Sequence, residues 1–558
     1  MEVFFLLQKN KLLVIPLGGL GEIGKNMTVF QYGDDIVILD AGLAFPEDDM
    51  FGIDLVIPDM SYLLDNRDKI RAVVLTHGHE DHIGALSYLL REINVPVYGT
   101  KLTLALVECR LRENNVADTE LIPVEAGDEI NAGIFNIGFI QGSHSIPDAC
   151  GIYFKTPVGT VVHTGDFKID QTPVDGKHLD IHKFAELGDK GVLLMMSDST
   201  NAERPGYTGS EKDVALAIEE EIKNAKGRII MATFSSNVSR LQEAIYSGCR
   251  LGRKIAVFGR SMSNVIGIAT ELDYLQIAEG SIIDTEEIKN YRDEQLLILT
   301  TGSQGETMAG LSRMANNTHR NISIKPSDTI LIAANPIPGN EKSVSKTINN
   351  LLLLGADVIY EKISGIHVSG HASQEELKLM LNLIRPKFFI PVHGEFRMLS
   401  QHAKMAEELG VAKDHIFIGE NGNVFEFSSD SGALTRKVKS GRVYVDGLGV
   451  GDVGNIVIRD RKQLSQEGVV IVVLTVDKEN GIIISGPDIV SRGFVYVRDA
   501  EQLMYESRAK VNLALEKITQ KNMRDWSGIK SVIREALGTY LYEKTGRKPM
   551  ILPIVTEV

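Results

Sequence analysis

Short runs rich in apolar residues, separated by turns, fill much of the first 200 residues of the chain, and such runs are typical of β-strands. The pattern predicts a hairpin with strands over 27–32 and 35–42 and the Gly-Asp-Asp run at 33–35 as its turn. A helix is predicted over 83–93. Further strands are predicted over 11–17, 71–76, 95–100, 135–140, 151–156 and 160–166.

The pattern changes near residue 210 to an alternation of helices and strands. Helices are predicted over 210–225 and 238–252, and strands over 227–234, 254–259, 296–302 and 329–336. These strands are apolar almost throughout, as in a parallel sheet that helices cover on both faces. A Ser/Asp/Gly-rich stretch at 428–432 and a following glycine-rich run indicate a linker. Helices over 503–518 and 529–544 and a strand over 550–555 then predict a small α/β module.

Composition places the chain among ordinary globular proteins, with 43% hydrophobic and 24% charged residues. The cysteines Cys109, Cys150 and Cys249 form no Cys-x-x-Cys pair, which fits a reducing cytoplasm and excludes a disulfide framework. No apolar run reaches the roughly 18 residues of a membrane span, and no signal peptide is evident, so a cytoplasmic protein is expected. The net charge of −15 argues against a general nucleic-acid coat but permits one basic groove.

A glycine motif near the start of the chain invites a dinucleotide-binding interpretation. Gly19, Gly21 and Gly24 match G-x-G-x-x-G, and Asp40 follows at a suitable distance. That fold needs a helix to begin at the glycines so that its N–H groups face a pyrophosphate. A hairpin follows instead, so the glycines are expected to form a tight loop near the active site.

The strongest chemical pattern is the run Leu-Thr-His-Gly-His-Glu-Asp-His-Ile-Gly at 75–84. His77 and His79 are two residues apart on a predicted loop, so both can point toward one ion. Asp81 and His82 lie where a helix begins and can turn toward a second ion. Imidazole and carboxylate suit zinc, and manganese is possible.

More ligands are needed to close two metal sites, and the chain offers them after later apolar runs. His144, Asp166 and His393 each follow a predicted strand or an apolar segment. Any one of them alone would more often be a packed core or loop residue. Together with the 75–84 run they favour a metal centre.

These motifs carry a resemblance to a known family. His-x-His-x-Asp-His followed by a His, an Asp and a late His resembles the metallo-β-lactamase fold. The runs at 197–200, 369–373 and 391–395 resemble the three extra motifs of its nucleic-acid-cleaving β-CASP branch. Six further runs, at 17–26, 76–85, 163–168, 301–306, 335–340 and 490–497, are similar to the bacterial ribonuclease J family. The resemblance covers essentially the whole chain, and Ser143, where threonine is more usual, is a local departure.

The resemblance implies an α/β architecture, namely a metallo-β-lactamase αββα sandwich with an inserted β-CASP α/β domain and a small C-terminal α/β domain. The sandwich is expected over 1–208 and 364–428, with the β-CASP domain over 209–363. A linker is expected over 429–465 and an assembly domain over 466–558.

The resemblance also implies the ligands. One Zn²⁺ would be held by His77, His79 and His144, and a second by Asp81, His82 and His393, with Asp166 as the bridge and Mn²⁺ or Mg²⁺ as possible substitutes. Asp40 is either a carboxylate that orients ligating side chains or a turn former, with the two alternatives evenly weighted. His163 is expected to be structural.

The function implied is a metal-dependent hydrolase acting as a 5′-to-3′ exoribonuclease and endoribonuclease in rRNA processing and RNA decay. Hydroxide between the two ions would attack phosphorus in line and leave 5′-monophosphate products. Asp81 is counted among the catalytic residues because it would hold the second ion. His371 would serve the departing 3′-oxygen, and Asp198 would fix its tautomer.

The resemblance implies single-stranded RNA as the substrate. A 5′-monophosphate end is expected, because two predicted helix starts offer neutral donors to one phosphate. The residues concerned are Ser235, Ser236 and Asn237 at one start and His367, Val368, Ser369, Gly370 and His371 at the other. Ser373 and Glu376 are spaced as a capping box, so Ser373 is expected only to cap its helix.

Three other functions remain open at this point. They are a β-CASP nuclease acting on DNA, a small-ester hydrolase of the same metal fold, and a non-catalytic RNA-binding subunit of a nuclease assembly. The expected partners are RNA, a second copy or three further copies of the chain, a paralogous subunit and other RNA-decay proteins.

Overall fold

The computed structural model describes residues 11–47, 49–116, 118–302, 309–334, 340–360, 365–477, 482–495, 501–517 and 526–558. The chain divides into two compact units, one of residues up to Phe45 with Val56–Val443 and the other of Pro46–Leu55 with Tyr444–Val558. The first ten residues lie outside the described residues. So do most of the runs at 301–306 and 335–340, the end of the run at 490–497 and the expected domain boundary at 363–364.

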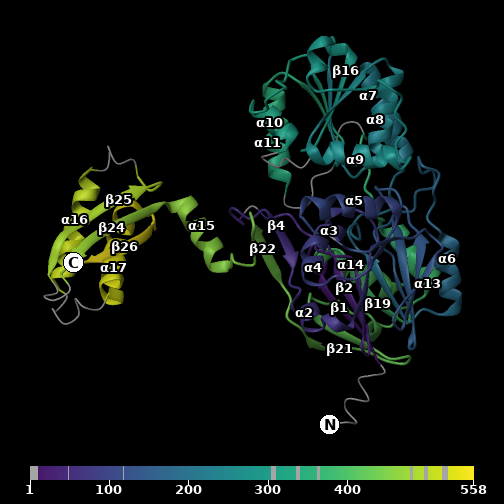
Figure 1. The fold of residues 1–558 in the computed structure, drawn as a ribbon, viewed down its shortest axis with the longest axis horizontal. Coiled ribbons are helices and arrows are strands. Elements are labelled where there is room, and N and C mark those ends of the chain that lie inside the picture. The colour runs from purple at the N-terminus through teal and green to yellow at the C-terminus, as the bar shows by residue number, and fades with distance from the viewer. Residues whose placement is uncertain are drawn as a thin grey trace, which may run out of the picture. The chain divides into compact units, whose positions relative to one another are not determined.

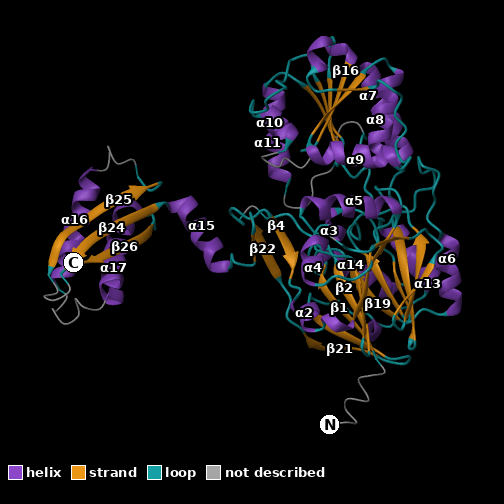
Figure 2. Ribbon diagram, in the orientation of Figure 1, coloured by secondary structure: helices purple, strands orange, loops and turns teal. Residues whose placement is uncertain are grey.

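Two sheets form the body of the first unit (Figures 1 and 2). An eight-stranded sheet has the order β21 (Gly432–Lys437), β20 (Asn423–Phe427), β1 (Leu12–Gly18), β2 (Met27–Tyr32), β3 (Asp35–Leu39), β5 (Ile70–Val74), β6 (Val97–Gly99), β7 (Leu121–Pro123). A six-stranded sheet has the order β19 (Phe388–Val392), β12 (Leu194–Asp198), β11 (Gly159–His163), β10 (Cys150–Thr156), β9 (Phe135–Gln141), β8 (Glu129–Ala132). Strands β2 and β3 form the predicted hairpin.

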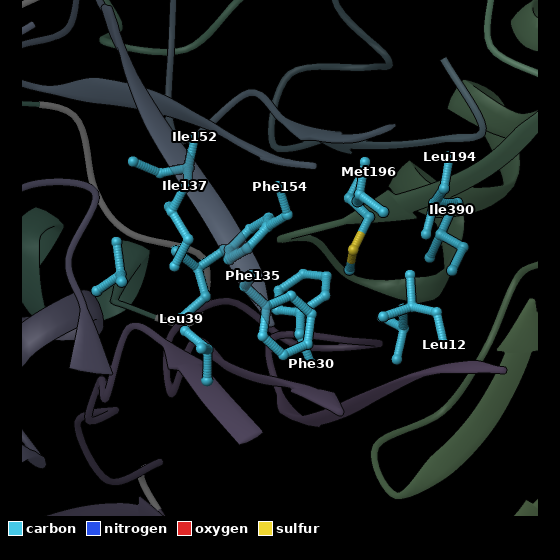
Figure 3. Close-up of a cluster of buried hydrophobic side chains, with 14 of the residues drawn as sticks. Leu12, Phe30, Leu39, Phe135, Ile137, Ile152, Phe154, Leu194, Met196 and Ile390 are labelled. Atoms are coloured by element: carbon cyan, nitrogen blue, oxygen red, sulfur yellow. The ribbon is translucent and has the colours of Figure 1, made fainter. Parts of the chain in front are cut away.

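A cluster of buried apolar side chains joins the inner faces of these two sheets (Figure 3). Phe30 from the first sheet stacks on Phe154 from the second, with ring centroids 4.3 Å apart. The outer faces are covered by helices, so the layers run helix, sheet, sheet, helix. The helices are α2 (Ser61–Asp65), α3 (Glu80–Ile83), α4 (Leu86–Glu92) and α5 (Lys101–Glu113) by the first sheet, and α6 (Ile181–Lys190), α13 (Gln374–Ile384) and α14 (Phe396–Glu408) by the second.

A third sheet lies between β12 and α13 in the sequence, and all its pairings are parallel. Its order is β15 (Ile282–Ile283), β14 (Lys254–Phe258), β16 (Leu296–Thr300), β13 (Ile229–Ala232), β17 (Thr329–Ile332), β18 (Asp357–Tyr360). Its helices are α7 (Glu211–Asn224), α8 (Val238–Arg250) and α9 (Arg260–Glu271) by one apolar face, and α10 (Gly310–Ala315) and α11 (Glu341–Leu353) by the other. The continuous apolar strands predicted this arrangement, because a central parallel strand is buried on both faces.

The segment expected to be a linker, 429–465, has more regular structure than its composition indicated. It contains β21, β22 (Arg442–Asp446), β23 (Gly449–Val450) and most of α15 (Asn455–Glu467). Strand β21 pairs with β20 and is therefore an edge strand of the first sheet. Its side chains are mostly exposed, which explains why the apolar pattern did not indicate a strand.

The second unit contains a three-stranded sheet and two long helices. The strands are β25 (Ile483–Arg492), β24 (Val469–Val476) and β26 (Met550–Glu557), and the helices are α16 (Glu501–Glu516) and α17 (Trp526–Thr545). Alternate residues of β24 are buried against the helices, as expected for a sheet covered on one face. The short strand β4 (Leu55–Pro58) begins at the last residue of the 46–55 segment of this unit and continues into the first unit. Among the helices of the described residues, none combines the length and the apolar composition that a bilayer crossing requires.

A buried ion pair at one end of the third sheet leads to a stability prediction. Arg228 donates from Nε to Asp328 Oδ1 at 3.0 Å and from Nη2 to Oδ2 at 2.6 Å, and both side chains are almost fully buried. Asp328→Ala leaves the guanidinium uncompensated, so we expect the free energy of unfolding to fall by about 3–5 kcal/mol. Urea denaturation followed by circular dichroism measures the change. Asp189→Ala, which removes an exposed partner of Arg385, is the control and should change little.

Candidate metal centre and active site

Three adjacent parallel strands bring residues from distant parts of the chain to one edge of the six-stranded sheet. Strand β11 pairs with β12, and β12 pairs with β19, all in the same direction. Asp166 follows the end of β11, Asp198 ends β12, and His393 follows β19. Because the carboxyl ends of parallel strands meet at one edge, these three side chains lie together.

The facing sheet contributes the histidine run in the same way. Strands β3 and β5 are parallel, so Asp40 and Thr76, which follow their ends, are neighbours. His77 lies on the loop after β5, and His79 precedes α3, a single turn that contains His82. The run at 75–84 therefore reaches the same edge as Asp166.

Three imidazoles form what we call the first cluster, namely His77, His79 and His144. His77 Nε2 lies 3.0 Å from His79 Nδ1, and His144 Nε2 lies 3.1 Å from the same atom. The three rings are the ones that the resemblance assigned to the first ion.

The second cluster consists of Asp81, His82, Asp166 and His393, whose candidate ligand atoms all lie within 4.8 Å of one another. Asp81 Oδ2 lies 3.2 Å from His393 Nε2, and Asp166 Oδ2 lies 3.3 Å from His82 Nε2. This is the set that the sequence assigned to the second ion.

Asp166 lies between the two clusters. Its Oδ2 atom is 3.7 Å from His77 Nε2, 3.9 Å from His144 Nε2 and 3.3 Å from His82 Nε2. One carboxylate can thus serve both sets of ligands. Imidazole nitrogens with carboxylate oxygens are a donor set suited to zinc and related divalent ions, so the residues present fit a metal centre.

Hydrogen bonds from outside the clusters orient the rings. His82 donates from Nδ1 to Asp40 Oδ2 at 2.7 Å, because the carboxylate has no proton to give. Thr76 donates from Oγ1 to the same oxygen at 2.8 Å and lies 3.0 Å from His77 Nδ1. Both rings therefore direct Nε2 toward the clusters, as ligating histidines do when a second partner fixes their orientation. Of the two roles that the sequence left open for Asp40, this contact favours the carboxylate that orients a ligating side chain over the turn former.

Two residues at this edge have left-handed backbone. Asp40 has φ of 60° and His393 has φ of 53°, a region that residues other than glycine seldom adopt. The His393 N–H donates to Gly19 O at 2.9 Å, which holds the ring in place. The glycine-rich loop thus lies beside the site without forming a helix, as expected. His163 also follows its prediction, because its Nδ1 accepts from the Gly165 N–H at 3.0 Å.

Electrostatics differ between the two clusters. Burial lowers the pKa of all three rings of the first cluster, that of His79 to about 4. These rings are neutral, so their lone pairs are available to a cation. Burial also acts to lower the pKa of His82 and His393, but the surrounding carboxylates, Asp166 foremost with Asp81, together outweigh it and raise the pKa of both rings well above the usual value.

His371 lies beside the clusters and pairs with Asp198. The distance from His371 Nδ1 to Asp198 Oδ2 is 2.8 Å, and the His371 side chain is 19% exposed. Burial acts to lower the pKa of His371, but the Asp198 carboxylate reverses this and raises it. Thr200 donates to Asp198 Oδ1 from both its N–H and its hydroxyl, which fixes the carboxylate. This ring therefore donates through Nδ1 and directs Nε2 away from the pair.

The residues expected to contact phosphate at α8 have different environments. Asn237 is buried and caps α8, because its Oδ1 accepts from the Arg240 N–H at 3.1 Å. Ser235 is half-buried and its hydroxyl lies 2.7 Å from that of Ser261. Ser236 is half-buried. Capping thus accounts for Asn237, and the two serines remain available to a ligand.

The loop before α13 is held mainly by contacts within the protein. Asn201 donates to Ser369 Oγ at 2.8 Å, and the His371 N–H donates to the same oxygen at 3.2 Å. His144 donates from Nδ1 to Gly370 O at 2.7 Å. A Cβ at Gly370 would lie 2.6 Å from His144 Cε1. Gly370, which the sequence placed in the phosphate-binding loop, thus allows the backbone to approach this imidazole closely. Ser373 and Glu376 form the expected capping box.

Sequence reasoning missed three polar side chains that support the site, namely Thr76, Asn26 and Asn201. Asn26 donates from Nδ2 to Asp81 O at 3.2 Å, and the same nitrogen lies 3.1 Å from His82 Nε2. Asn201 also donates to His371 O at 2.9 Å. Thr76 and Asn26 lie inside motifs that the sequence singled out, so their position was the available signal. Asn201 directly follows the 197–200 run.

Comparison with protein families assigns each part of the chain. The metallo-β-lactamase superfamily model matches residues 20–189, and the model of the ribonuclease J β-CASP domain matches 226–351. The model of the zinc-dependent metallo-hydrolase RNA specificity domain matches 355–418, and that of the ribonuclease J C-terminal domain matches 456–558. The fold expected from the resemblance is confirmed.

Similar curated proteins span nearly the whole chain. Ribonuclease J2 of Bacillus subtilis is 47% identical over 98% of both chains, and ribonuclease J 1 of Streptococcus pyogenes is 46% identical over 98% of both. Among solved structures, a protein of unknown function from Enterococcus faecalis is similar with a TM-score of 0.53 and 16% identity, covering 75% of this chain and all of that one. That likeness concerns the fold alone.

Matched domain models in the expected order, near-complete coverage by relatives and a metal centre with every expected ligand type lead to one conclusion: the chain belongs to the ribonuclease J family of the metallo-β-lactamase superfamily.

Proposed function

We propose that this chain hydrolyses single-stranded RNA, both stepwise from the 5′ end and internally, and leaves 5′-monophosphate products. The observation that carries the proposal is the position of Asp166 Oδ2 between two ligand clusters, with the His371–Asp198 pair beside them. The family membership and the matched RNA specificity domain support RNA as the substrate.

The two clusters support a centre for two divalent ions, with zinc favoured by the imidazole content. His77, His79 and His144 would hold one ion, Asp81, His82 and His393 the other, and Asp166 both. When bound, such an ion pair supplies an activated water and neutralises charge on a phosphodiester. Asp40 and Thr76 would keep the rings oriented for this role.

His371 would act on the departing 3′-oxygen. Asp198 accepts from Nδ1, so Nε2 is the atom that holds or delivers a proton. The His371 side chain is 19% exposed, so a substrate can reach it. A charge-bearing imidazole here can also stabilise the developing alkoxide before the proton moves.

The 5′ end of the RNA would bind between the start of α8 and the loop before α13. Ser369 Oγ accepts two hydrogen bonds inside the protein, so its hydroxyl hydrogen is free to reach a phosphate oxygen. Ser236 offers a second donor. Neutral donors sized for one phosphate favour a monophosphate over a hydroxyl or a triphosphate end.

We assign the C-terminal unit to subunit assembly, as dimer or tetramer. Leu552 and Ile554 of β26 and Ile484 and Val490 of β25 are exposed apolar side chains on its sheet. Exposed apolar surface of this kind is typical of a face that another chain covers.

The general test is cleavage of matched RNA and DNA strands that carry 5′-hydroxyl, monophosphate or triphosphate ends. We expect RNA to be cut, with stepwise digestion fastest from the monophosphate end. Equal cutting of DNA would favour a DNA nuclease, and binding of RNA without cutting would favour a non-catalytic subunit. Either result would refute the proposal.

The ligand assignment predicts the behaviour of two variants. His77→Ala and Asp81→Ala should each lose bound metal and RNA cleavage together while the far-ultraviolet circular dichroism is unchanged, because each removes a ligand at an edge of the sheet. Metal content is measured by inductively coupled plasma mass spectrometry. His182→Ala, at an exposed helix position, is the control and should retain both properties. Normal metal content and full activity in either ligand variant would contradict the assignment.

The His371 assignment predicts a separation of metal binding from turnover. His371→Ala should retain metal and lose about 10²–10⁴-fold in kcat, the usual contribution of a general acid–base group. Asp198→Asn should lose activity in the same direction, because an amide cannot fix the tautomer as a carboxylate does. Loss of bound metal in His371→Ala would show that the ring is a ligand instead.

The 5′-phosphate assignment predicts an effect on one mode of cleavage. Ser369→Ala or Ser236→Ala should lower kcat/KM for stepwise digestion of monophosphate RNA about tenfold or more, since a hydrogen bond to a charged group contributes about 1.5–3 kcal/mol. Internal cleavage should be spared. Ser345→Ala, an exposed position of α11, is the control. Equal loss of both modes would count against the pocket.

A further inference from the structure

Four charged side chains are buried together near the place where the chain passes from the six-stranded sheet to the parallel sheet. They are Lys168, Asp170, Glu211 and Arg240, and none of these side chains is more than 7% exposed. Lys168 and Asp170 follow β11, Glu211 begins α7, and Arg240 lies in the first turn of α8. The first two therefore belong to the metal-binding part and the other two to the inserted part.

Arg240 contacts the loop that carries His371. Its Nη1 donates to His367 Nδ1 at 2.9 Å and to Ala333 O, after β17, at 2.6 Å. Its Nη2 lies 3.4 Å from Val368 O. The guanidinium thus bridges the end of β17 and the residues immediately before Ser369.

Glu211 holds the other side of the guanidinium and extends the contact toward the metal centre. Its two carboxylate oxygens accept from Arg240 Nη2 at 3.1 and 3.2 Å. Lys168 Nζ lies 3.7 Å from Glu211 Oε1 and 3.4 Å from Asp170 Oδ2. The Lys168 N–H donates to Ser143 O at 2.9 Å, next to the ligand His144. Two cations and two anions therefore alternate between the metal ligands and the loop.

Burying four charges is costly, and apolar side chains of similar volume would often give equal or greater stability. The charged groups instead fix the orientation of their partners. A guanidinium has five N–H donors in one rigid plane, so the acceptors that bind it must lie at defined positions. Burial and the Arg240 charge lower the pKa of His367 to about 2. The ring is therefore neutral, and its Nδ1 can accept the hydrogen bond from Arg240. The network therefore fixes the geometry of the loop more than it stabilises the fold.

We infer that Arg240 is a positioning residue, which aligns the loop 365–371 so that Ser369 and His371 face the metal centre. This inference rests on the proposed function for its effect on cleavage, although its effect on the loop does not. Arg240 itself is fully buried, so it does not contact RNA. Through this residue the inserted parallel sheet controls the alignment of a cleavage group held on the other part of the unit.

The test removes both members of the central pair at once. Arg240→Met/Glu211→Met leaves the Lys168–Asp170 pair balanced and fills similar volume, so the variant should fold and its bound metal should be close to the parent. The thermal midpoint should fall modestly, because His367 Nδ1 and Ala333 O lose their donor. We expect kcat for internal cleavage to fall about 10²-fold, because small misplacement of reacting groups costs about that much. KM for a long RNA should change little. Amide hydrogen exchange without RNA should accelerate in peptides that cover 365–373.

A matched control uses the other buried Arg–Asp pair of the inserted sheet. Arg228→Met/Asp328→Met alters the same chemistry away from the loop, so kcat and exchange over 365–373 should match the parent. If the Arg240 double variant does not fold, Arg240→Lys serves instead. The lysine keeps the positive charge beside Glu211 but cannot reach His367 and Ala333 together. Amide exchange over 365–373 should accelerate as in the double variant, and the loss of kcat should be smaller.

The outcomes separate this inference from the proposed function. Unchanged exchange over 365–373 in a folded variant would overturn the positioning role, whatever the activity. An equal loss of kcat in the Arg228 control would also overturn it, by showing a general effect of destabilising the sheet. A parent protein that binds metal but cuts no RNA would refute the proposed function, while faster exchange in the variant would still support the positioning role.

Discussion

The structure depends on one electrostatic constraint, which is that imidazole lone pairs and carboxylates face one another in a buried space. The three nitrogens of the first cluster lie 3.0 and 3.1 Å from their neighbours, and Asp166 adds negative charge between both clusters. Lone pairs directed at one point repel unless a cation lies there. The fold must therefore hold these groups rigidly before any ion binds, and a divalent ion would compensate the repulsion.

Each layer of the structure serves that requirement. Parallel strands bring Asp166, Asp198 and His393 to one edge, and the facing sheet brings the histidine run to the same place. Partners outside the clusters then fix ring orientation, with Asp40 accepting from His82 and Gly370 from His144. The last contact crosses between distant segments, so the loop that carries His371 is joined directly to His144 of the first cluster. Under the proposed function, this contact couples metal binding to leaving-group chemistry.

The sequence predicted the parts of the site that are local in the chain or lie in recognisable motifs. His77, His79, Asp81 and His82 were evident because ligand types are crowded after a buried strand. The apolar runs also predicted several strands of the two sandwich sheets, but β7, β8, β12, β19 and β20 were not predicted. The Arg240–Glu211 pair and the Gly370 carbonyl could not be predicted, because they arise from contacts between segments far apart in sequence. The edge strand β21 escaped detection for another reason: its exposed polar side chains lack the apolar period that indicates a strand.

The central claim is that the two clusters hold two divalent ions with Asp166 between them. The most direct measurement is anomalous X-ray diffraction at the zinc edge from crystals of the zinc-loaded protein. The account predicts two anomalous peaks about 3.5–4 Å apart, one beside His77, His79 and His144 and the other beside Asp81, His82 and His393, with the Asp166 carboxylate contacting both. A single peak, or two peaks with Asp166 directed away from them, would contradict it.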